Sequence, residues 1–247
     1  MTPPVSTEPL LEVRGLRAGY GASLVLEDLD FSMGAEAVGI VGRNGMGKTT
    51  LCDTLVGFLP PTGGEIRLRG QRLDGRAPEK IAGAGIAYVP QGRRLFPSLT
   101  VDEHLAMLAR RTRAKRWTPA AVYELFPRLA ERRKHGGAAL SGGEQQMLAV
   151  GRALLLNAHL IVMDEPSEGL APTIVDVLVD VVHRLVDEGV AVLVVEQNLR
   201  AAVRMAQRQL VMVSGRLEAE FSGAELLDRP DLQSRYLGVG GADRALR

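Results

Sequence analysis

Four short apolar runs in the chain stop abruptly on polar or glycine-rich residues. Their length and their content of valine and isoleucine are typical of strands that are covered on both faces in a parallel sheet. The runs are AVGIV (37–41) before GRNGMGKTT, IAYV (86–89) before Pro90 and Gln91, LIVM (160–163) before Asp164 and Glu165, and AVLVV (191–195) before Glu196, Gln197 and Asn198. Ligands of open α/β sheets bind outside the carboxyl ends of the strands. The pattern therefore predicts that the four polar tips line one crevice.

Segments with helical character lie between these runs. TTLCDTLVGFL follows the first run, and EQQMLAVGRALLLN carries an apolar stripe of Met147, Val150 and Leu154. The longest segment, TIVDVLVDVVHRLVDEG, keeps its apolar residues at helical spacing and stops at Gly189. Helices between the strands of a parallel sheet indicate an α/β fold.

Composition limits the classes of protein to consider. With 247 residues, 46% of them hydrophobic, the chain can bury a sizeable core. A formal net charge of +1 argues neither for nor against a polyanionic partner. The apolar runs are far shorter than the roughly 18 to 20 residues that cross a bilayer, and MTPPVSTEPL has no pattern of a secretory signal. The single cysteine, Cys52, excludes an internal disulfide, favours a reducing compartment, and is expected in the core.

The residues after the first run form a phosphate-binding loop pattern. The loop comprises Gly42, Arg43, Asn44, Gly45, Met46, Gly47, Lys48, Thr49 and Thr50. In such a loop, backbone N–H groups and the N-terminus of the next helix hold phosphates, Lys48 reaches the β- and γ-phosphates, and the Thr49 hydroxyl ligates Mg²⁺. The alternative is a chance match in a glycine-rich chain. The position between a predicted strand and a predicted helix favours the nucleotide site.

The sequence LIVMDEP supplies the acidic groups that hydrolysis requires. Asp164 fits the carboxylate that holds Mg²⁺, and Glu165 fits the general base that orients the attacking water. The alternative interpretation is a turn followed by a helix start. Both interpretations hold together, because a strand end and a helix start form the predicted crevice.

A second glycine-rich element is LSGGEQQ (140–146). Ser141 and Glu144 match a capping box at a helix N-terminus, which is a sufficient structural explanation for these two residues. The paired Gly142 and Gly143 suit close approach of the backbone to an anion. The chain thus carries two candidate phosphate sites. Either it binds two nucleotides, or each element supplies half of a site that two chains share.

The order and spacing of these motifs resemble an ATPase subunit of ABC transporters over about residues 10 to 238. Four segments, VPQGRRLFPSLTVDEHL, DEPSEGLAP, VVEQN and the C-terminal YLG, are similar to the second ATPase subunit of branched-chain amino acid importers, with the urea-importer ATPase as an alternative. The resemblance implies a P-loop NTPase of the α/β class with a RecA-like core (10–89 and 156–238), an antiparallel β portion near its N-terminus and an inserted helical subdomain (about 90–155). Residues 1–9 and 239–247 are expected to be tails.

Roles of individual residues also follow from the resemblance. Tyr20 would stack on adenine, and Gln91 would contact Mg²⁺ and the attacking water, so that Thr49, Gln91 and Asp164 form the metal set. Ser141, Gly142 and Gly143 would contact the γ-phosphate of ATP held by a partner chain.

The resemblance implies an assembly as well as a reaction. ATP would lie in a head-to-tail dimer of identical chains or of two related ATPase subunits, and would be hydrolysed to ADP and phosphate. The dimer would be coupled to membrane permease subunits and an extracytoplasmic binding protein. It would work as a peripheral protein on the cytoplasmic face of the inner membrane, without contacting the transported molecule.

Two positions depart from the general family pattern. The loop Ser167-Glu168-Gly169-Leu170 stands where many relatives have Ser-Ala-Leu-Asp, so the usual aspartate at the dimer interface is missing. Gln197 occupies the position of the switch histidine. It can donate and accept hydrogen bonds but is not an effective base, which leaves that role to Glu165. Glu196 would point to the other side of the strand, and Asn198 would cap the next helix.

The basic segment RRTRAKR (110–116), followed by Trp117, favours a competing class. Arginines beside an aromatic residue can bind nucleic acid, and some soluble ABC proteins act on ribosomes or DNA. Such relatives usually carry two cassettes or long inserts, which this sequence lacks. We therefore favour a solvated charged segment and an amino-acid importer, with a urea or short-amide importer next and a nucleic-acid protein last.

Overall fold

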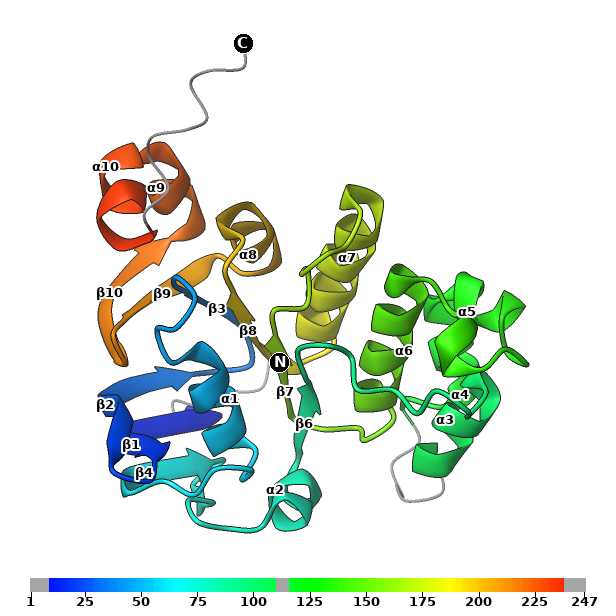
Figure 1. Ribbon diagram of the computed structural model, residues 1–247, viewed down its shortest axis with the longest axis horizontal. Helices are drawn as coiled ribbons and strands as arrows, with labels where there is room; N and C mark the ends of the chain where they lie inside the picture. Colours follow the sequence, from blue (N-terminus) through cyan, green and yellow to red (C-terminus); the bar gives the residue numbers. More distant parts are fainter. Residues whose placement is uncertain (1–8, 110–115, 238–247) are drawn as a thin grey trace, which may run out of the picture.

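Two β-sheets and a separate group of helices make up the computed structural model, which describes residues 9–109 and 116–237 (Figure 1). The expected tails lie outside the described residues, except for residue 9 of the first tail. Residues 110–115 of the basic segment also lie outside them. No helix in the described ranges is long and apolar enough to cross a membrane.

The larger sheet contains the four predicted strands as direct neighbours. Its order is β10-β9-β3-β8-β7-β6, with β10 (Arg216–Ser222) antiparallel to β9 and the other neighbouring pairs parallel. The parallel strands are β3 (Ala37–Val41), β6 (Ile86–Val89), β7 (Leu160–Asp164), β8 (Ala191–Glu196) and β9 (Arg208–Val213). The prediction of a parallel α/β sheet is confirmed, and the polar tips lie at one edge of it.

Both faces of this sheet are buried, which explains why its strands are apolar throughout. Along β8, Val192 and Val194 belong to one hydrophobic cluster, whereas Leu193 and Val195 belong to another on the opposite face. This alternation follows from the two-residue period of a strand. Helices α7 (Pro172–Asp187) and α6 (Gly142–Leu154) contribute to the first cluster, and α1 (Lys48–Leu55) contributes to the second.

The N-terminal part forms a second, antiparallel sheet of order β2-β1-β4-β5. Its strands are β1 (Leu11–Tyr20), β2 (Ser23–Met33), β4 (Gly63–Leu68) and β5 (Gln71–Arg72). Leucines of β1 and β2 share the cluster that also covers α1, so this sheet lies against the helix that follows the phosphate loop. The expected antiparallel portion is thus present.

A helical group lies on the far side of the large sheet from the antiparallel sheet (Figure 1). It contains α3 (Val101–Ala109), α4 (Pro119–Leu125), α5 (Pro127–Glu131), the short η1 (Gly137–Ala139) and α6. The remaining helices are α2 (Pro78–Ala84), α8 (Leu199–Met205), α9 (Gly223–Asp228), α10 (Pro230–Leu232) and the turn η2 (Gln233–Leu237). Met147, Val150 and Leu154 of α6 are buried, as their spacing predicts.

The first predicted helix is shorter than its sequence suggests. The segment TTLCDTLVGFL predicts a helix to residue 59, but α1 ends at Leu55. Gly57 has a φ of 82°, and a Cβ there would lie 2.7 Å from the carbonyl oxygen of Arg76. The N–H groups of Gly57 and Phe58 bond back to the carbonyl oxygens of Thr54 at 3.3 Å and Asp53 at 2.8 Å, so a left-handed glycine ends the helix locally, and the close approach of Arg76 adds a steric requirement for glycine.

Candidate functional site

The phosphate loop lies between the carboxyl end of β3 and the start of α1. Gly47 precedes the helix with a φ of 100°, and a Cβ at Gly42 would lie 2.5 Å from the carbonyl oxygen of Met212. Glycine is therefore required at both positions for steric reasons. In the part of the chain that the structure describes, no side chain caps the first turn of α1, so its first backbone N–H groups remain available to an anion.

Lys48 is buried and holds the loop together from inside. Its side chain is 4% exposed, and Nζ donates to the carbonyl oxygens of Gly42 at 3.0 Å and Arg43 at 3.1 Å. Nζ also lies 3.2 Å from Oε1 of Glu165. Within the described residues, Nζ thus makes two hydrogen bonds to the backbone of the loop and an ion pair with the Glu165 carboxylate. A phosphate that binds Lys48 would compete with these groups.

Glu165 lies just beyond β7 in an unusual backbone conformation. Its φ is 47°, and its backbone N–H donates to the carbonyl oxygen of Val195 at 2.8 Å. A positive φ at a non-glycine residue costs free energy and persists only where the surroundings impose it. Oε2 accepts a hydrogen bond from Nε2 of Gln91 at 3.2 Å, so the carboxylate is held between Lys48 and Gln91.

Asp164 is buried beside Glu165 and is incompletely paired. Its Oδ2 accepts from the hydroxyl of Tyr88 at 3.3 Å, while Oδ1 is buried and has no hydrogen-bond partner among the described residues. Burial raises the pKa of Asp164 to about 6, although a hydrogen bond from Thr49 opposes this effect. An unsatisfied carboxylate oxygen beside a threonine hydroxyl suits Mg²⁺, which prefers oxygen ligands. Within the described ranges, Asp164 included, no group of three or more Asp, Glu, His or Cys residues is arranged to hold a metal ion by itself.

The glycine pair of LSGGEQQ has packing roles within its own chain. Ser141 and Glu144 form the predicted capping box, with the Ser141 N–H 2.8 Å from Oε2 of Glu144. A Cβ at Gly142 would lie 3.3 Å from Nη1 of Arg93, and one at Gly143 would lie 2.8 Å from Cγ1 of Ile174. Within the described residues, no hydrogen bond or ion pair joins this element to the phosphate loop. The structure therefore does not bring Ser141, Gly142 and Gly143 together with Lys48.

Tyr20 lies at the end of β1 in the hairpin that borders the phosphate loop. Its side chain is 54% exposed, and it pairs across the hairpin with Ser23. Two residues further along β2, Val25 contacts the position where a Cβ of Gly47 would lie. An exposed aromatic ring beside the loop is available to stack on a flat ligand.

The three polar residues at the end of β8 differ in burial and in hydrogen bonding. Glu196 is buried, and its carboxylate accepts from the backbone N–H groups of Ser167 at 2.9 Å and Asn198 at 3.2 Å. Burial raises the pKa of Glu196, although these hydrogen bonds oppose the shift. Asn198 caps α8 through the N–H of Ala201. Gln197 is exposed, and its side chain has no hydrogen-bond partner in the described part of the chain.

Two residues that the sequence does not place in the site also contact it. Nε2 of Gln91 donates to Oε2 of Glu168 at 3.0 Å, and Nη2 of Arg93 donates to the carbonyl oxygen of Glu168 at 3.4 Å. The unusual sequence around Glu168 is the only signal that could have indicated it. Arg93 carries no such signal, because its contacts depend on the tertiary fold.

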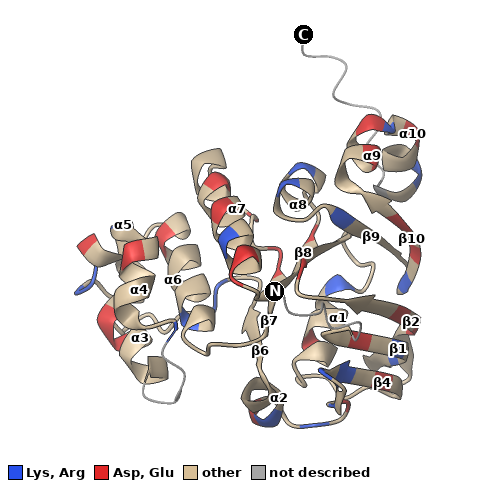
Figure 2. Cartoon of the chain, turned by 180° about the vertical axis from the view of Figure 1, so that it is seen from behind, with Lys and Arg blue, Asp and Glu red and all other residues tan. Residues whose placement is uncertain are grey.

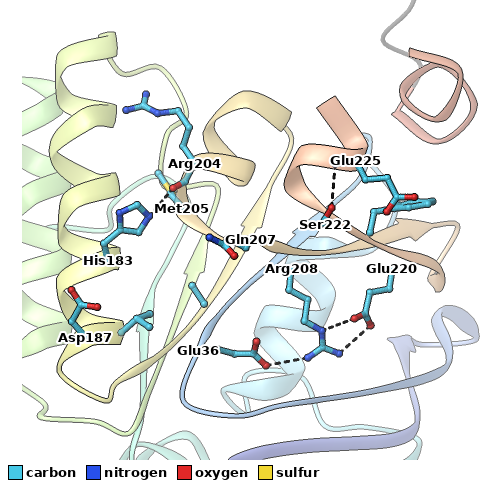
Figure 3. A pocket seen from close by; sticks show the side chains of 13 residues that line it. Glu36, His183, Asp187, Arg204, Met205, Gln207, Arg208, Glu220, Ser222 and Glu225 are labelled. Carbon is cyan, nitrogen blue, oxygen red and sulfur yellow. Dashed lines mark hydrogen bonds and ion pairs between the residues drawn. The ribbon is translucent and has the colours of Figure 1, made fainter. Parts of the chain in front are cut away.

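A cavity of about 640 Å³ lies at the opposite edge of the large sheet (Figure 3). It is lined by residues at the amino ends of β3 and β9, where Arg208 bridges Glu36 and Glu220. No residue predicted for the nucleotide site lines it. The residues expected to bind the nucleotide thus lie at the carboxyl edge of the sheet, away from this cavity.

The sequence and the fold match those of known proteins. Over residues 26–168 the sequence matches the family described as ABC transporter. It is 42% identical to the high-affinity branched-chain amino acid transport ATP-binding protein BraG of Pseudomonas aeruginosa, over 89% of this chain and 95% of that protein. The probable branched-chain amino acid transport ATP-binding protein LivF of Archaeoglobus fulgidus is 32% identical, with 93% and 99% covered. A solved ATP binding subunit of an ABC transporter superposes with a TM-score of 0.77 at 31% identity, over 93% of this chain and 96% of that one. The chain therefore belongs to the ABC transporter family and is one of its ATPase subunits.

Proposed function

We propose that this chain powers an importer of branched-chain or other hydrophobic amino acids by hydrolysing ATP. The observation that carries the proposal is the meeting of Lys48, Asp164, Glu165 and Gln91 at one edge of the sheet. The amino-acid specificity is supported by the names of the two relatives described above.

In this proposal each side chain acts at a stated atom. The N–H groups of the loop and Nζ of Lys48 bind the phosphates, and Glu165 accepts the proton of the attacking water. Oδ1 of Asp164 and the Thr49 hydroxyl would hold Mg²⁺, with the Oε1 atom of Gln91 as a further ligand. When bound, the ion neutralises charge on the phosphate oxygens. Gln197 senses the γ-phosphate as a neutral hydrogen-bonding group.

Two chains would complete each nucleotide site. Ser141, Gly142 and Gly143 are not hydrogen-bonded to the phosphate loop of their own chain, and Ser141 is exposed at the start of α6. We assign these residues to the ATP held by a partner, which is either an identical chain or a related ATPase subunit. Tyr20 would stack on the adenine of the nucleotide that its own chain binds.

The membrane permease would dock where the helical group meets the core. A groove of about 320 Å³ there is lined by Phe58, Tyr88, Pro90, Arg94 and Arg152, among others, and Pro90 directly precedes Gln91. The Phe58 side chain is 55% exposed, and an exposed aromatic ring beside arginines suits a protein partner. In this proposal the chain works on the cytoplasmic face of the inner membrane, in one system with an extracytoplasmic binding protein.

The structure argues against the nucleic-acid alternative at the residues it describes. Trp117 is buried at 5% exposure, so it is not available for stacking on a base, and Arg116 pairs with Glu188. Figure 2 shows acidic and basic residues interspersed over the described elements. Residues 110–115 lie outside the described residues.

Co-purification with the membrane subunits and the binding protein, followed by uptake in vesicles, tests the proposal. We expect ATP-dependent uptake of leucine, isoleucine or valine that stops with Glu165→Gln. Uptake of urea or a short amide instead would assign the transporter to the alternative class. Binding of RNA or DNA in preference to the membrane subunits would refute the importer altogether.

A further inference from the structure

Gln91 is held by two carboxylates, not one. Its Nε2 atom donates to Oε2 of Glu165 at 3.2 Å and to Oε2 of Glu168 at 3.0 Å. A primary amide has two N–H groups, and ionised carboxylates only accept hydrogen bonds. The pair of carboxylates therefore determines which way the amide faces. Its carbonyl oxygen is directed away from both and has no hydrogen-bond partner among the described residues.

Glu168 is itself fixed from two sides. Its backbone N–H donates to the carbonyl oxygen of Glu165 at 3.1 Å, and its own carbonyl oxygen accepts from Arg93 at 3.4 Å. The guanidinium of Arg93 lies against Gly142, the first residue of α6, where a Cβ would be 3.3 Å from Nη1. A continuous set of contacts thus runs from the start of α6 through Arg93 and Glu168 to Gln91.

We propose that Glu168 is a positioning residue for hydrolysis, which acts by orienting the amide of Gln91. Without the Glu168 carboxylate, one N–H of Gln91 loses its acceptor, and the amide can rotate about its terminal bond. Its carbonyl oxygen is then no longer presented in one direction. The inference rests on the role of Gln91 in the proposed function. With this role for Glu168, the unusual Ser-Glu-Gly-Leu loop acts on the site of its own chain.

The test compares ATP turnover of four full-length variants: Glu168→Ala, Glu168→Gln, Gln91→Ala and the double variant Gln91→Ala/Glu168→Ala. We expect Glu168→Ala to lower kcat about tenfold, the effect of losing one charge-assisted hydrogen bond, with KM for ATP changed less than about twofold. Glu168→Gln keeps an oxygen acceptor and should restore most of kcat. The double variant should be no slower than Gln91→Ala, because Glu168 acts only through Gln91.

Controls separate this role from a structural one. Glu168 is exposed, so its replacement should leave thermal unfolding and binding of a fluorescent ATP analogue unchanged. Glu131→Ala removes another exposed carboxylate with an arginine partner, in α5, and should behave as the wild type.

The outcomes distinguish this inference from the proposed function. A slow Gln91→Ala with a normal Glu168→Ala would overturn the positioning role and leave the proposed function standing. A double variant slower than Gln91→Ala by the full Glu168→Ala factor would show that Glu168 acts independently, which also overturns it. Normal turnover by Gln91→Ala would remove the assigned role of Gln91 and this inference with it.

Discussion

Lys48 and Glu165 form a buried ion pair, with Nζ 3.2 Å from Oε1 and the side chains 4% and 9% exposed. The residue expected to bind phosphate and the residue expected to activate water are thus each other's partners. In the proposed mechanism, a phosphate that replaces Glu165 on Lys48 would also free Oε1 of the carboxylate, so this one contact would link nucleotide binding to activation of the base.

Replacing Glu165 by Gln should suppress hydrolysis and preserve ATP binding. The amide cannot accept the proton of water, and loss of a general base lowers turnover by roughly 10²- to 10⁴-fold. Without the ion pair Lys48 is freer to bind phosphate, so the affinity for ATP should equal or exceed that of the wild type. Turnover assays and size-exclusion chromatography with ATP would test this, and we expect an ATP-bound dimer. Near-normal hydrolysis would exclude Glu165 as the base.

Replacing Lys48 by Met should weaken nucleotide binding and also destabilise the protein. The variant leaves the Glu165 carboxylate without its cation, at a cost on the order of 2 kcal/mol in unfolding free energy. Adding Glu165→Gln to Lys48→Met should recover most of this stability, because no unpaired charge remains. Chemical denaturation and nucleotide titration would measure both effects. If the double variant were as unstable as Lys48→Met, the ion pair would not be the cause.

Ser141→Arg should abolish cooperative ATP hydrolysis if two chains share each site. The bulky cation would occupy the position expected to face the partner's nucleotide, while loss of the helix cap costs only about 1 kcal/mol. Ser222→Arg is a control, because the Ser222 hydroxyl also caps a helix, α9, by accepting from the N–H three residues on. The Hill coefficient and turnover of the two variants would be compared. Unchanged cooperativity in Ser141→Arg would contradict the shared site.

Gln197→Ala should reduce hydrolysis less than Glu165→Gln does. The Gln197 side chain is exposed and makes no hydrogen bond within the described residues, so the fold should be unaffected. The variant loses a sensor of phosphate but keeps the base. Parallel measurements of kcat would settle the order, and a larger loss in Gln197→Ala would mean that the tip of β8 carries more of the chemistry than Glu165.

The helical group should lose stability in mild acid because of His104. Nε2 of His104 accepts a hydrogen bond from the N–H of Phe96 at 3.0 Å, and its Nδ1 lies 2.9 Å from the carbonyl oxygen of Thr100. Only the neutral ring can accept at Nε2 and donate at Nδ1. Burial, reinforced by Arg152, lowers the pKa of His104 below 6.5. The contribution of neutral His104 to the free energy of unfolding is therefore present above about pH 6.5 and is lost as the pH falls through the folded-state pKa of His104.

Unfolding of the wild type, His104→Gln and the exposed-site control His135→Gln at pH 5 and 7.5 would test this. His104→Gln should show a smaller loss of stability in acid than the other two proteins. Equal losses in all three would assign the acid sensitivity to other groups.

Local sequence determined the strands and the phosphate loop. Val194 could be assigned to a buried strand because a strand that is covered on both faces needs a run of consecutive apolar residues. Lys48 could be assigned to a phosphate loop because such a loop needs a glycine-rich turn directly before a helix. The capping box of Ser141 and the cap at Asn198 are local in the same sense, since each involves residues only three positions apart.

Only the tertiary structure decided which of these residues meet. The four strand tips were expected to share one crevice, but the individual contacts of Lys48 with Glu165, Gln91 with Glu168 and Arg93 with Gly142 join residues far apart in sequence, and no local pattern encodes them. Trp117 is buried for the same reason, because it packs in a hydrophobic cluster with residues that lie far from it in the sequence. Each of these outcomes depends on which side chains and backbone segments the folded sheets and helices bring within contact distance, and neighbouring residues in the sequence do not carry that information.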